Sequence, residues 1–80
     1  MILKNSSGFR INLTTTMPAD GLVPLNTIVF SRVRGRRLGL IIGYNADTNG
    51  WYPAWRYPYV ILWEDGYFEV YTPSQFEVIA

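Results

Sequence analysis

The fold of this protein is decided by residues 63–79, WEDGYFEVYTPSQFEVI. Asp65-Gly66 stands between two strand-like runs, where a two-residue turn needs the positive φ that glycine adopts without steric cost and aspartate tolerates. The chain then returns as an antiparallel strand over Tyr67–Tyr71, in which every second side chain shares a face. Thr72–Gln75 has a capping residue before proline and predicts a single helical turn, followed by a closing strand at Phe76–Ile79.

Strands of the same kind precede this stretch. Apolar residues alternate or form short runs broken by Gly, Pro, Asn and Asp, and no window keeps the period of an amphipathic helix. We expect an edge strand within residues 8–16, strands at residues 27–33 and 57–64, and a central strand at residues 38–44. Gly39 and Gly43 inside the central strand indicate strong local twist or bending. The predicted fold class is therefore all-β.

The composition is that of one compact domain. The chain has 80 residues, 49% of them hydrophobic and 16% aromatic, which is near the lower limit for a single apolar core. It contains no cysteine and no histidine, which removes disulfides, thiol nucleophiles and the side chain best suited to acid–base catalysis near neutral pH. Seven basic and six acidic residues give a net charge of +1, too balanced to indicate a polyanion or a membrane as partner. We expect no enzymatic activity, no cofactor, no metal and no membrane association.

Three segments carry a resemblance to a known family. They are Arg37–Gly43, similar to a second strand, Tyr59–Gly66, similar to a third strand and distal hairpin, and Tyr71–Ile79, similar to a helical turn and closing strand. In this order the chain resembles the small SH3-like barrels, especially their Tudor- and KOW-like branch, over residues 26–79. The resemblance implies one domain with five to six antiparallel strands and a short helical turn before the last strand. Residues 1–25 would form an N-terminal extension and loop, and residues 26–80 the barrel.

The period of two also predicts the core. Trp63 shares a face with Tyr59 and Ile61, which we assign to the interior. Val60 and Leu62 lie on the opposite face and need cover from the N-terminal segment or from another subunit. The expected core comprises Ile28, Phe30, Leu40, Ile42, Ile61, Trp63, Phe68, Val70, Phe76 and Val78.

The resemblance also implies a class of function. Barrels of this kind mostly recognise peptides, nucleic acids or neighbouring subunits, so the chain is expected to be a non-catalytic interaction module. Similar stand-alone small proteins are frequent among tailed bacteriophages, which implies a phage-encoded protein that acts in the host cytoplasm or in the virion. The protein partner stays unidentified at this point, and a homo-oligomer is left open.

The first candidate surface is a loop of aromatic residues. Residues 45–56 form a connection of about a dozen residues, against a median near 4 to 6 in compact domains. In one interpretation the rings fold over an open barrel end, because burying each ring would stabilise by roughly 1.5 to 3 kcal/mol. In the other they form an exposed protein-binding surface, since Trp, Tyr and Arg anchor interfaces. The candidates are Tyr44, Trp51, Tyr52, Trp55, Arg56 and Tyr57.

The second candidate surface is basic. It comprises Arg32, Arg34, Arg36 and Arg37. Their guanidinium groups suit phosphates, and nearby aromatic rings could stack on bases, which predicts nucleic-acid binding as the alternative function. The competing interpretation is a solvated edge whose arginines pair with Glu64, Asp65 or Glu69 and protect a strand from edge pairing.

Overall fold

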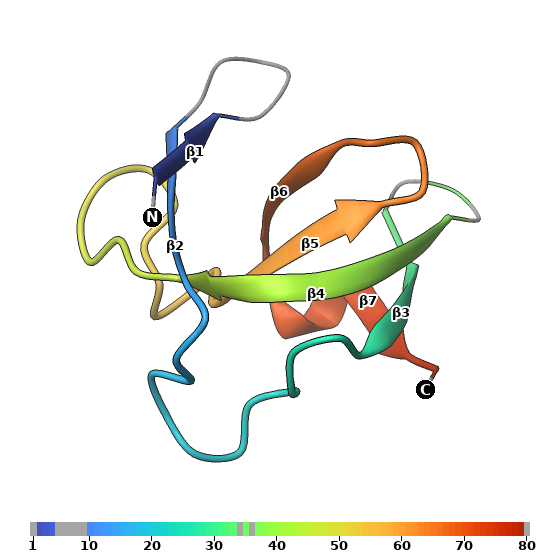
Figure 1. Cartoon of the computed structure of the whole chain (residues 1–80), viewed down its shortest axis with the longest axis horizontal. Helices are drawn as coiled ribbons and strands as arrows, with labels where there is room; N and C mark the ends of the chain where they lie inside the picture. Colours follow the sequence, from blue (N-terminus) through green and yellow to red (C-terminus); the bar gives the residue numbers. More distant parts are fainter. Residues whose placement is uncertain (1, 5–9, 34, 36, 80) are drawn as a thin grey trace.

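The structure, a computed structural model, describes residues 2–4, 10–33, 35 and 37–79. Its elements within these residues are β1 (Ile2–Lys4), β2 (Arg10–Thr14), β3 (Ile28–Ser31), β4 (Leu38–Asn45), β5 (Tyr59–Trp63), β6 (Phe68–Tyr71), the 3₁₀ turn η1 (Pro73–Gln75) and β7 (Phe76–Val78) (Figure 1). The prediction of an all-β fold with one helical turn before the last strand is confirmed. Within the described ranges, no helix is long and apolar enough to span a bilayer.

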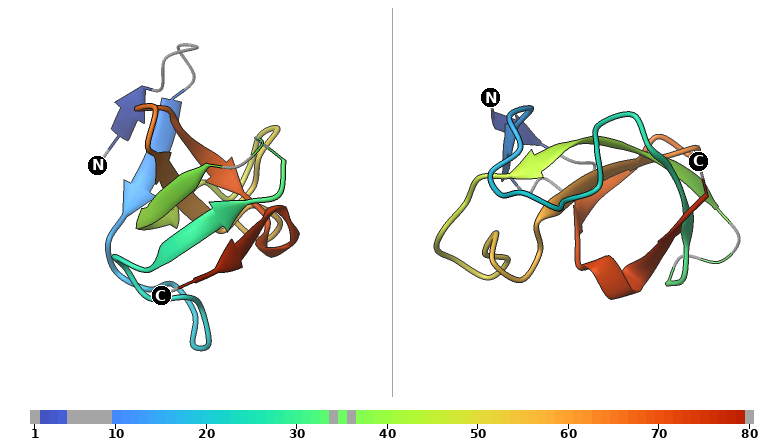
Figure 2. Two further views of the ribbon diagram at one scale, coloured as in Figure 1. Left: turned by 90° about the vertical axis from the view of Figure 1, so that its right-hand side faces the viewer. Right: turned by 90° about the horizontal axis from the view of Figure 1, so that it is seen from below.

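Strand β4 organises the sheet. One of its edges pairs antiparallel with β5, while β3 pairs with its first residues and β2 with its last. Strand β1 extends the sheet from β2, β7 from β3, and β6 from β5. Among the described pairings β6 contacts only β5 and β7 only β3, so the sheet is open between these two strands. Figure 2 shows how strongly it curls.

The hairpin tip lies where the sequence predicts it but is one residue longer. Trp63 N–H donates to the Tyr67 carbonyl at 2.8 Å, which leaves Glu64, Asp65 and Gly66 as a three-residue loop. Gly66 N–H donates to the Trp63 carbonyl at 2.9 Å, and Gly66 has a φ of 91°. A turn followed by one left-handed glycine is the usual three-residue hairpin connection, so only Gly66 needs the special backbone.

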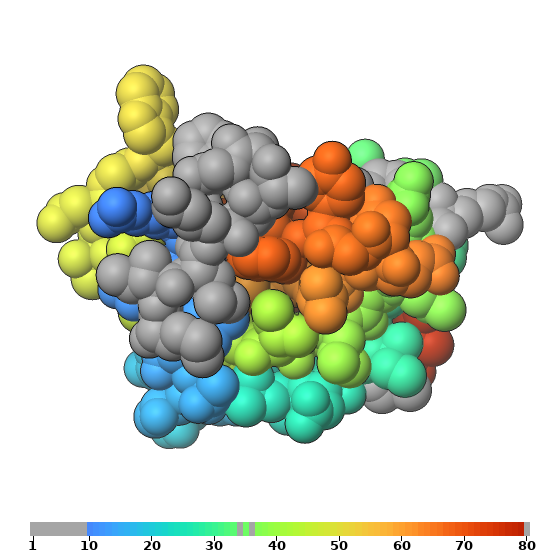
Figure 3. Space-filling view, turned by 45° about the horizontal axis from the view of Figure 1, so that its top comes forward, coloured from blue at the N-terminus to red at the C-terminus, as the bar shows by residue number. Residues whose placement is uncertain are grey.

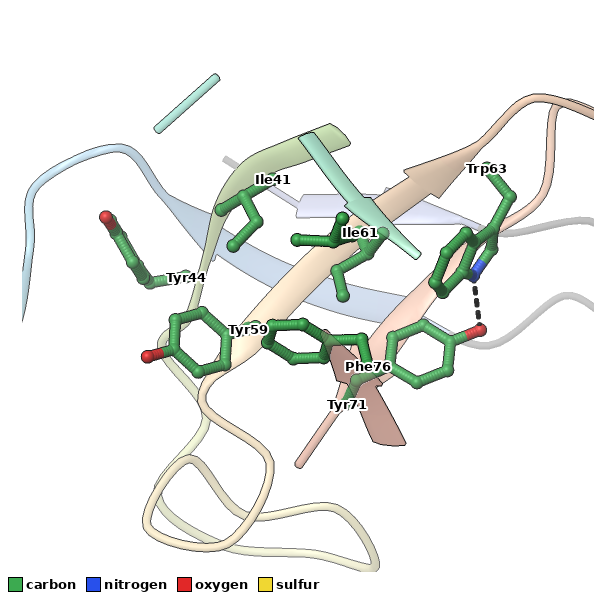
Figure 4. Packing of buried hydrophobic residues seen from close by; sticks show 8 residues of the cluster. Ile41, Tyr44, Tyr59, Ile61, Trp63, Tyr71 and Phe76 are labelled. Carbon is green, nitrogen blue, oxygen red and sulfur yellow. Dashed lines mark hydrogen bonds between the residues drawn. The ribbon is translucent and has the colours of Figure 1, made fainter. Parts of the chain in front are cut away.

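The main apolar cluster lies on one face of β4 and β5 (Figure 4). Trp63 packs edge-on against Tyr71 with ring centroids 5.3 Å apart, and its Nε1–H donates to the Tyr71 hydroxyl at 2.7 Å. The polar atom of each ring is therefore satisfied inside the core. The buried members are Val29, Ile41, Tyr44, Tyr59, Ile61, Trp63, Tyr71 and Phe76. The assignment of Tyr59, Ile61 and Trp63 to the interior is confirmed.

A second, smaller cluster covers the opposite face of the sheet. Val60 is fully buried there by Ile11 and Leu13 of β2, with Ile42, Phe68 and Val70 packed against them. The expected cover for Val60 thus comes from the N-terminal segment of the same chain. Phe68 and Val70 do face apolar neighbours, although they belong to this cluster and not to the main one.

In β3 and β4 the predicted core face is wrong. Ile28 is 42% exposed and Phe30 only half-buried, while Val29 and Ser31 are buried in their place. Leu40 and Ile42 are half-buried, and Val78 at the end of β7 is 54% exposed. Both faces of these strands are apolar in sequence, so alternation alone did not distinguish them.

The segment between β2 and β3 is fastened to the core at Val23. The Tyr44 hydroxyl donates to the Val23 carbonyl at 2.7 Å, and Val23 N–H donates to the Tyr59 hydroxyl at 3.0 Å. Leu22, Val23 and Leu25 pack against the main cluster. Burial raises the pKa of the Tyr44 hydroxyl above its usual value of 10.0, and the neighbouring Tyr59 adds to the rise.

Candidate functional site

The aromatic loop, residues 46–58, joins β4 to β5 at one end of the sheet (yellow in Figure 1). The loop is held by Asn45, the last residue of β4, which is 1% exposed. The Asn45 Nδ2 amide donates to the carbonyls of Tyr52 at 2.8 Å and Tyr57 at 3.0 Å, and Oδ1 accepts from Asp47 N–H at 3.0 Å. One buried amide therefore uses both of its donors and an acceptor to fix two distant points of the loop.

Further contacts within the loop complete this arrangement. Ala54 N–H donates to the Asp47 carbonyl at 2.7 Å, and Tyr57 N–H donates to the Pro53 carbonyl at 2.9 Å. The rings of Tyr52 and Tyr57 meet edge to face with centroids 5.2 Å apart. The loop is long, but its backbone is held by hydrogen bonds at both ends and in the middle.

The structure divides the six predicted protein-binding residues into three groups: exposed, loop-holding and buried. Trp51 is 91% exposed and Trp55 78% exposed, and Arg56 is exposed with its guanidinium 5.8 Å from the Tyr57 ring centroid. Tyr52 and Tyr57 help to hold the loop, and Tyr44 is 1% exposed and belongs to the core. Neither loop tryptophan fills the end of the sheet, and the buried indole is that of Trp63.

A groove of about 160 Å³ lies between the aromatic loop, β2 and β6. Its apolar lining includes Ile11, Val70 and Trp51. Figure 3 views one side of the molecule, where the yellow atoms of the loop project beyond the blue atoms of β2. The polar lining of the groove comprises Arg10, Asn45, Asp47, Asn49 and Glu69.

The groove contains four residues that the sequence did not predict as site residues: Arg10, Asp47, Asn49 and Glu69. They come from three separate segments, and no spacing in the sequence relates them. Only the position of β2 against the loop and β6 brings these charged and amide groups together. In the sequence, only the position of Asn49 inside the unusually long loop indicated that one of these four residues could belong to a site.

We call the basic surface predicted from Arg32, Arg34, Arg36 and Arg37 the arginine edge. Its described members, Arg32 and Arg37, lie at the other end of β4 from the aromatic loop. Arg37 pairs with Asp65 at 3.0 Å and Arg32 with Glu77 at 3.9 Å. Arg34 and Arg36 lie outside the described residues. The length of β4 therefore separates Arg32 and Arg37 from the exposed Trp51 and Trp55.

A second, open groove of about 340 Å³ runs over the outer face of β3, β4 and β5. Its lining is almost entirely apolar, with Ile28 and Leu38 exposed at 42% and 46%.

The described residues contain no group of three or more His, Cys, Asp or Glu side chains with the geometry to hold a metal ion.

Comparisons of the chain with protein-family models, with curated proteins and with solved structures found no match.

Proposed function

We propose that this protein is a non-catalytic interaction module with an SH3-like barrel fold, which binds a protein partner through the aromatic loop. One observation carries the proposal. Trp51 and Trp55 are 91% and 78% exposed on a loop whose backbone is anchored by the buried Asn45 amide.

The energetics favour a binding role for these two rings. Burying an aromatic side chain stabilises a fold by roughly 1.5 to 3 kcal/mol, so a domain of this size would gain from folding both indoles inward. The loop holds them outward instead. Trp and Arg dominate the binding energy of protein interfaces, and Arg56 is exposed one residue after Trp55. A loop that is already ordered also loses less conformational entropy when a partner binds.

The strand order supports the barrel part of the proposal. Strands β3, β4, β5 and β6 follow each other as antiparallel neighbours, and η1 then leads into β7, which returns to pair with β3. This is the order expected of an SH3-like barrel over residues 26–79. The non-catalytic part rests on a sequence without histidine or cysteine.

The experiment compares the affinities of wild type, one double variant and one single control variant for a purified partner. The partner is first captured from an extract of the source cells by immobilised wild-type protein, identified, and then titrated in pure form. We expect Trp51→Ala with Trp55→Ala to weaken its affinity at least about tenfold, the range of one or two lost anchor residues. Tyr67→Ala is the matched control, because Tyr67 is a 43% exposed aromatic residue on the other hairpin. Equal affinity of the tryptophan variant and wild type would contradict the proposal.

A further inference from the structure

The dipeptide Asn49-Gly50 lies in the aromatic loop immediately before Trp51. Both residues are exposed, and Gly50 has a φ of 96° with no atom beyond its own and those of its two chain neighbours within 4 Å of the position that a Cβ would occupy. A glycine after asparagine leaves the backbone nitrogen without a neighbouring side chain, so the asparagine side chain can approach it. Within the described part of the chain, no hydrogen bond engages the Asn49 amide or the Gly50 N–H.

We propose that Asn49 is a site of spontaneous deamidation. The backbone nitrogen of Gly50 attacks Cγ of Asn49, its proton passes to solvent, and a C–N bond closes a five-membered succinimide ring. The side-chain nitrogen takes up a proton and leaves as ammonia. Water then opens the ring at one of its two carbonyls and yields aspartate or isoaspartate. The net change replaces an amide by a carboxylate, consumes one water, releases one ammonia and needs no oxidant or reductant.

The fold protects another asparagine nearby and thereby makes the reaction selective. Asn45 is buried, and its amide nitrogen donates to the carbonyls of Tyr52 and Tyr57. The nitrogen that would have to attack it, in Ala46, donates to the Asn12 carbonyl at 2.7 Å. Both reacting groups of Asn45 are thus held in hydrogen bonds, whereas Asn49 and Gly50 are exposed and, within the described residues, neither reacting group is hydrogen-bonded.

The product alters the groove beside the aromatic loop. Asn49 lines this groove together with Arg10, Asp47 and Glu69, so its conversion adds a third carboxylate to a lining that has one guanidinium group. The formal net charge of the chain falls by one, from +1 to zero. Ring opening to isoaspartate also inserts a methylene group into the backbone two residues before Trp51. These consequences do not depend on the proposed function, because they concern the charge of the groove and the backbone of the loop, whatever binds there.

The test uses the purified 80-residue chain at physiological temperature and mildly alkaline pH. A synthetic peptide spanning residues 46–55 gives the rate for an unstructured chain. We expect a new species with one additional negative charge on ion exchange and the mass of an amide replaced by an acid. Peptide mapping should assign it to Asn49, at a rate within severalfold of that of the free peptide.

Two controls sharpen the test. In Asn49→Gln the side chain is one methylene longer and closes a less favourable ring, so this variant should remain a single species. Asn45 serves as the internal control and should stay an amide throughout. The proposal is overturned if the folded protein stays intact after the peptide has converted, or if the acidic species maps to a different asparagine.

Discussion

Gly39 and Trp63 are direct neighbours across β4 and β5, and the indole lies against the backbone of the glycine. A Cβ built on Gly39 would lie 2.5 Å from Trp63 Cε3 and 2.7 Å from the Ile61 Cγ2 methyl. No side chain is tolerated at such distances without movement. This pair therefore selects the core face of β4: the side that carries Gly39 and Ile41 turns inward, and Leu40 turns outward.

We expect Gly39→Ala to destabilise the protein by about 1 to 3 kcal/mol, the range for an overpacked core. Urea denaturation followed by far-UV circular dichroism measures the loss. Because the clash involves the indole, Trp63→Leu should cost less in the Gly39→Ala background than in wild type. Strictly additive losses in the double-mutant cycle would show that the two residues do not compete for the same space.

The three tryptophans should differ sharply in what they contribute to stability. Trp63→Ala should cost about 3 to 5 kcal/mol because it empties the main cluster. Trp51→Ala and Trp55→Ala should each stay within about 0.5 kcal/mol of wild type, as is usual for exposed positions. Thermal melts measure all three. A large loss at Trp51 or Trp55 would mean that its ring is packed in solution.

The Asn45 amide should control the order of the aromatic loop. Asn45→Ala removes the hydrogen bonds that the Asn45 amide donates to the Tyr52 and Tyr57 carbonyls, each at a cost of about 0.5 to 1.5 kcal/mol. Hydrogen exchange of the Ala54 and Tyr57 amides should accelerate. Exchange in β3 should respond far less, since it is hydrogen-bonded at the opposite end of β4. Unchanged exchange in the loop would contradict this role of Asn45.

The raised pKa of Tyr44 predicts a loss of stability in alkali. In the unfolded chain the tyrosine hydroxyl ionises near pH 10, whereas the folded state holds its proton to higher pH because the buried hydroxyl is poorly solvated. The contribution of the protonated Tyr44 hydroxyl to the free energy of unfolding is complete below its pKa in the unfolded chain. This contribution declines as pH rises from there through the pKa of Tyr44 in the folded state. Melting temperatures between neutral pH and pH about 11 measure this decline.

Tyr44→Phe is the matched variant for the alkaline transition. It removes the hydrogen bond to the Val23 carbonyl and should cost about 1 kcal/mol at neutral pH. Its melting temperature should nevertheless fall less steeply in alkali than that of wild type. An equally steep fall would assign the alkaline loss to other groups.

Nucleic-acid binding through the arginine edge stays a prediction with its own test. If the edge binds phosphates, affinity for single-stranded DNA should fall steeply with salt, and also in an Arg34→Ala, Arg36→Ala variant. The same DNA titration should be run on Arg32→Ala and Arg37→Ala for comparison, because Arg32 and Arg37 form ion pairs with Glu77 and Asp65. No measurable binding at low salt would remove this alternative.

The sequence by itself determined the strands other than β1, the position of the hairpin tip and the helical turn before β7. These features depend on local chemistry. Gly66 supplies a left-handed backbone, and the Thr72 N–H donates to Gln75 Oε1 at 2.9 Å to begin η1 around Pro73. Neighbours along the chain carry such signals, so they can be read without knowing the rest of the fold.

Tertiary structure alone decided which face of β3 and β4 turns inward and which residues line the groove. Both faces of these strands are apolar, and the choice depends on how Trp63 meets Gly39 across two strands. The outward position of Trp51 and Trp55 likewise depends on Asn45, whose hydrogen bonds reach seven and twelve residues along the chain. The apolar character of a side chain indicates that its burial is favourable. Packing geometry decides which of several apolar side chains is buried.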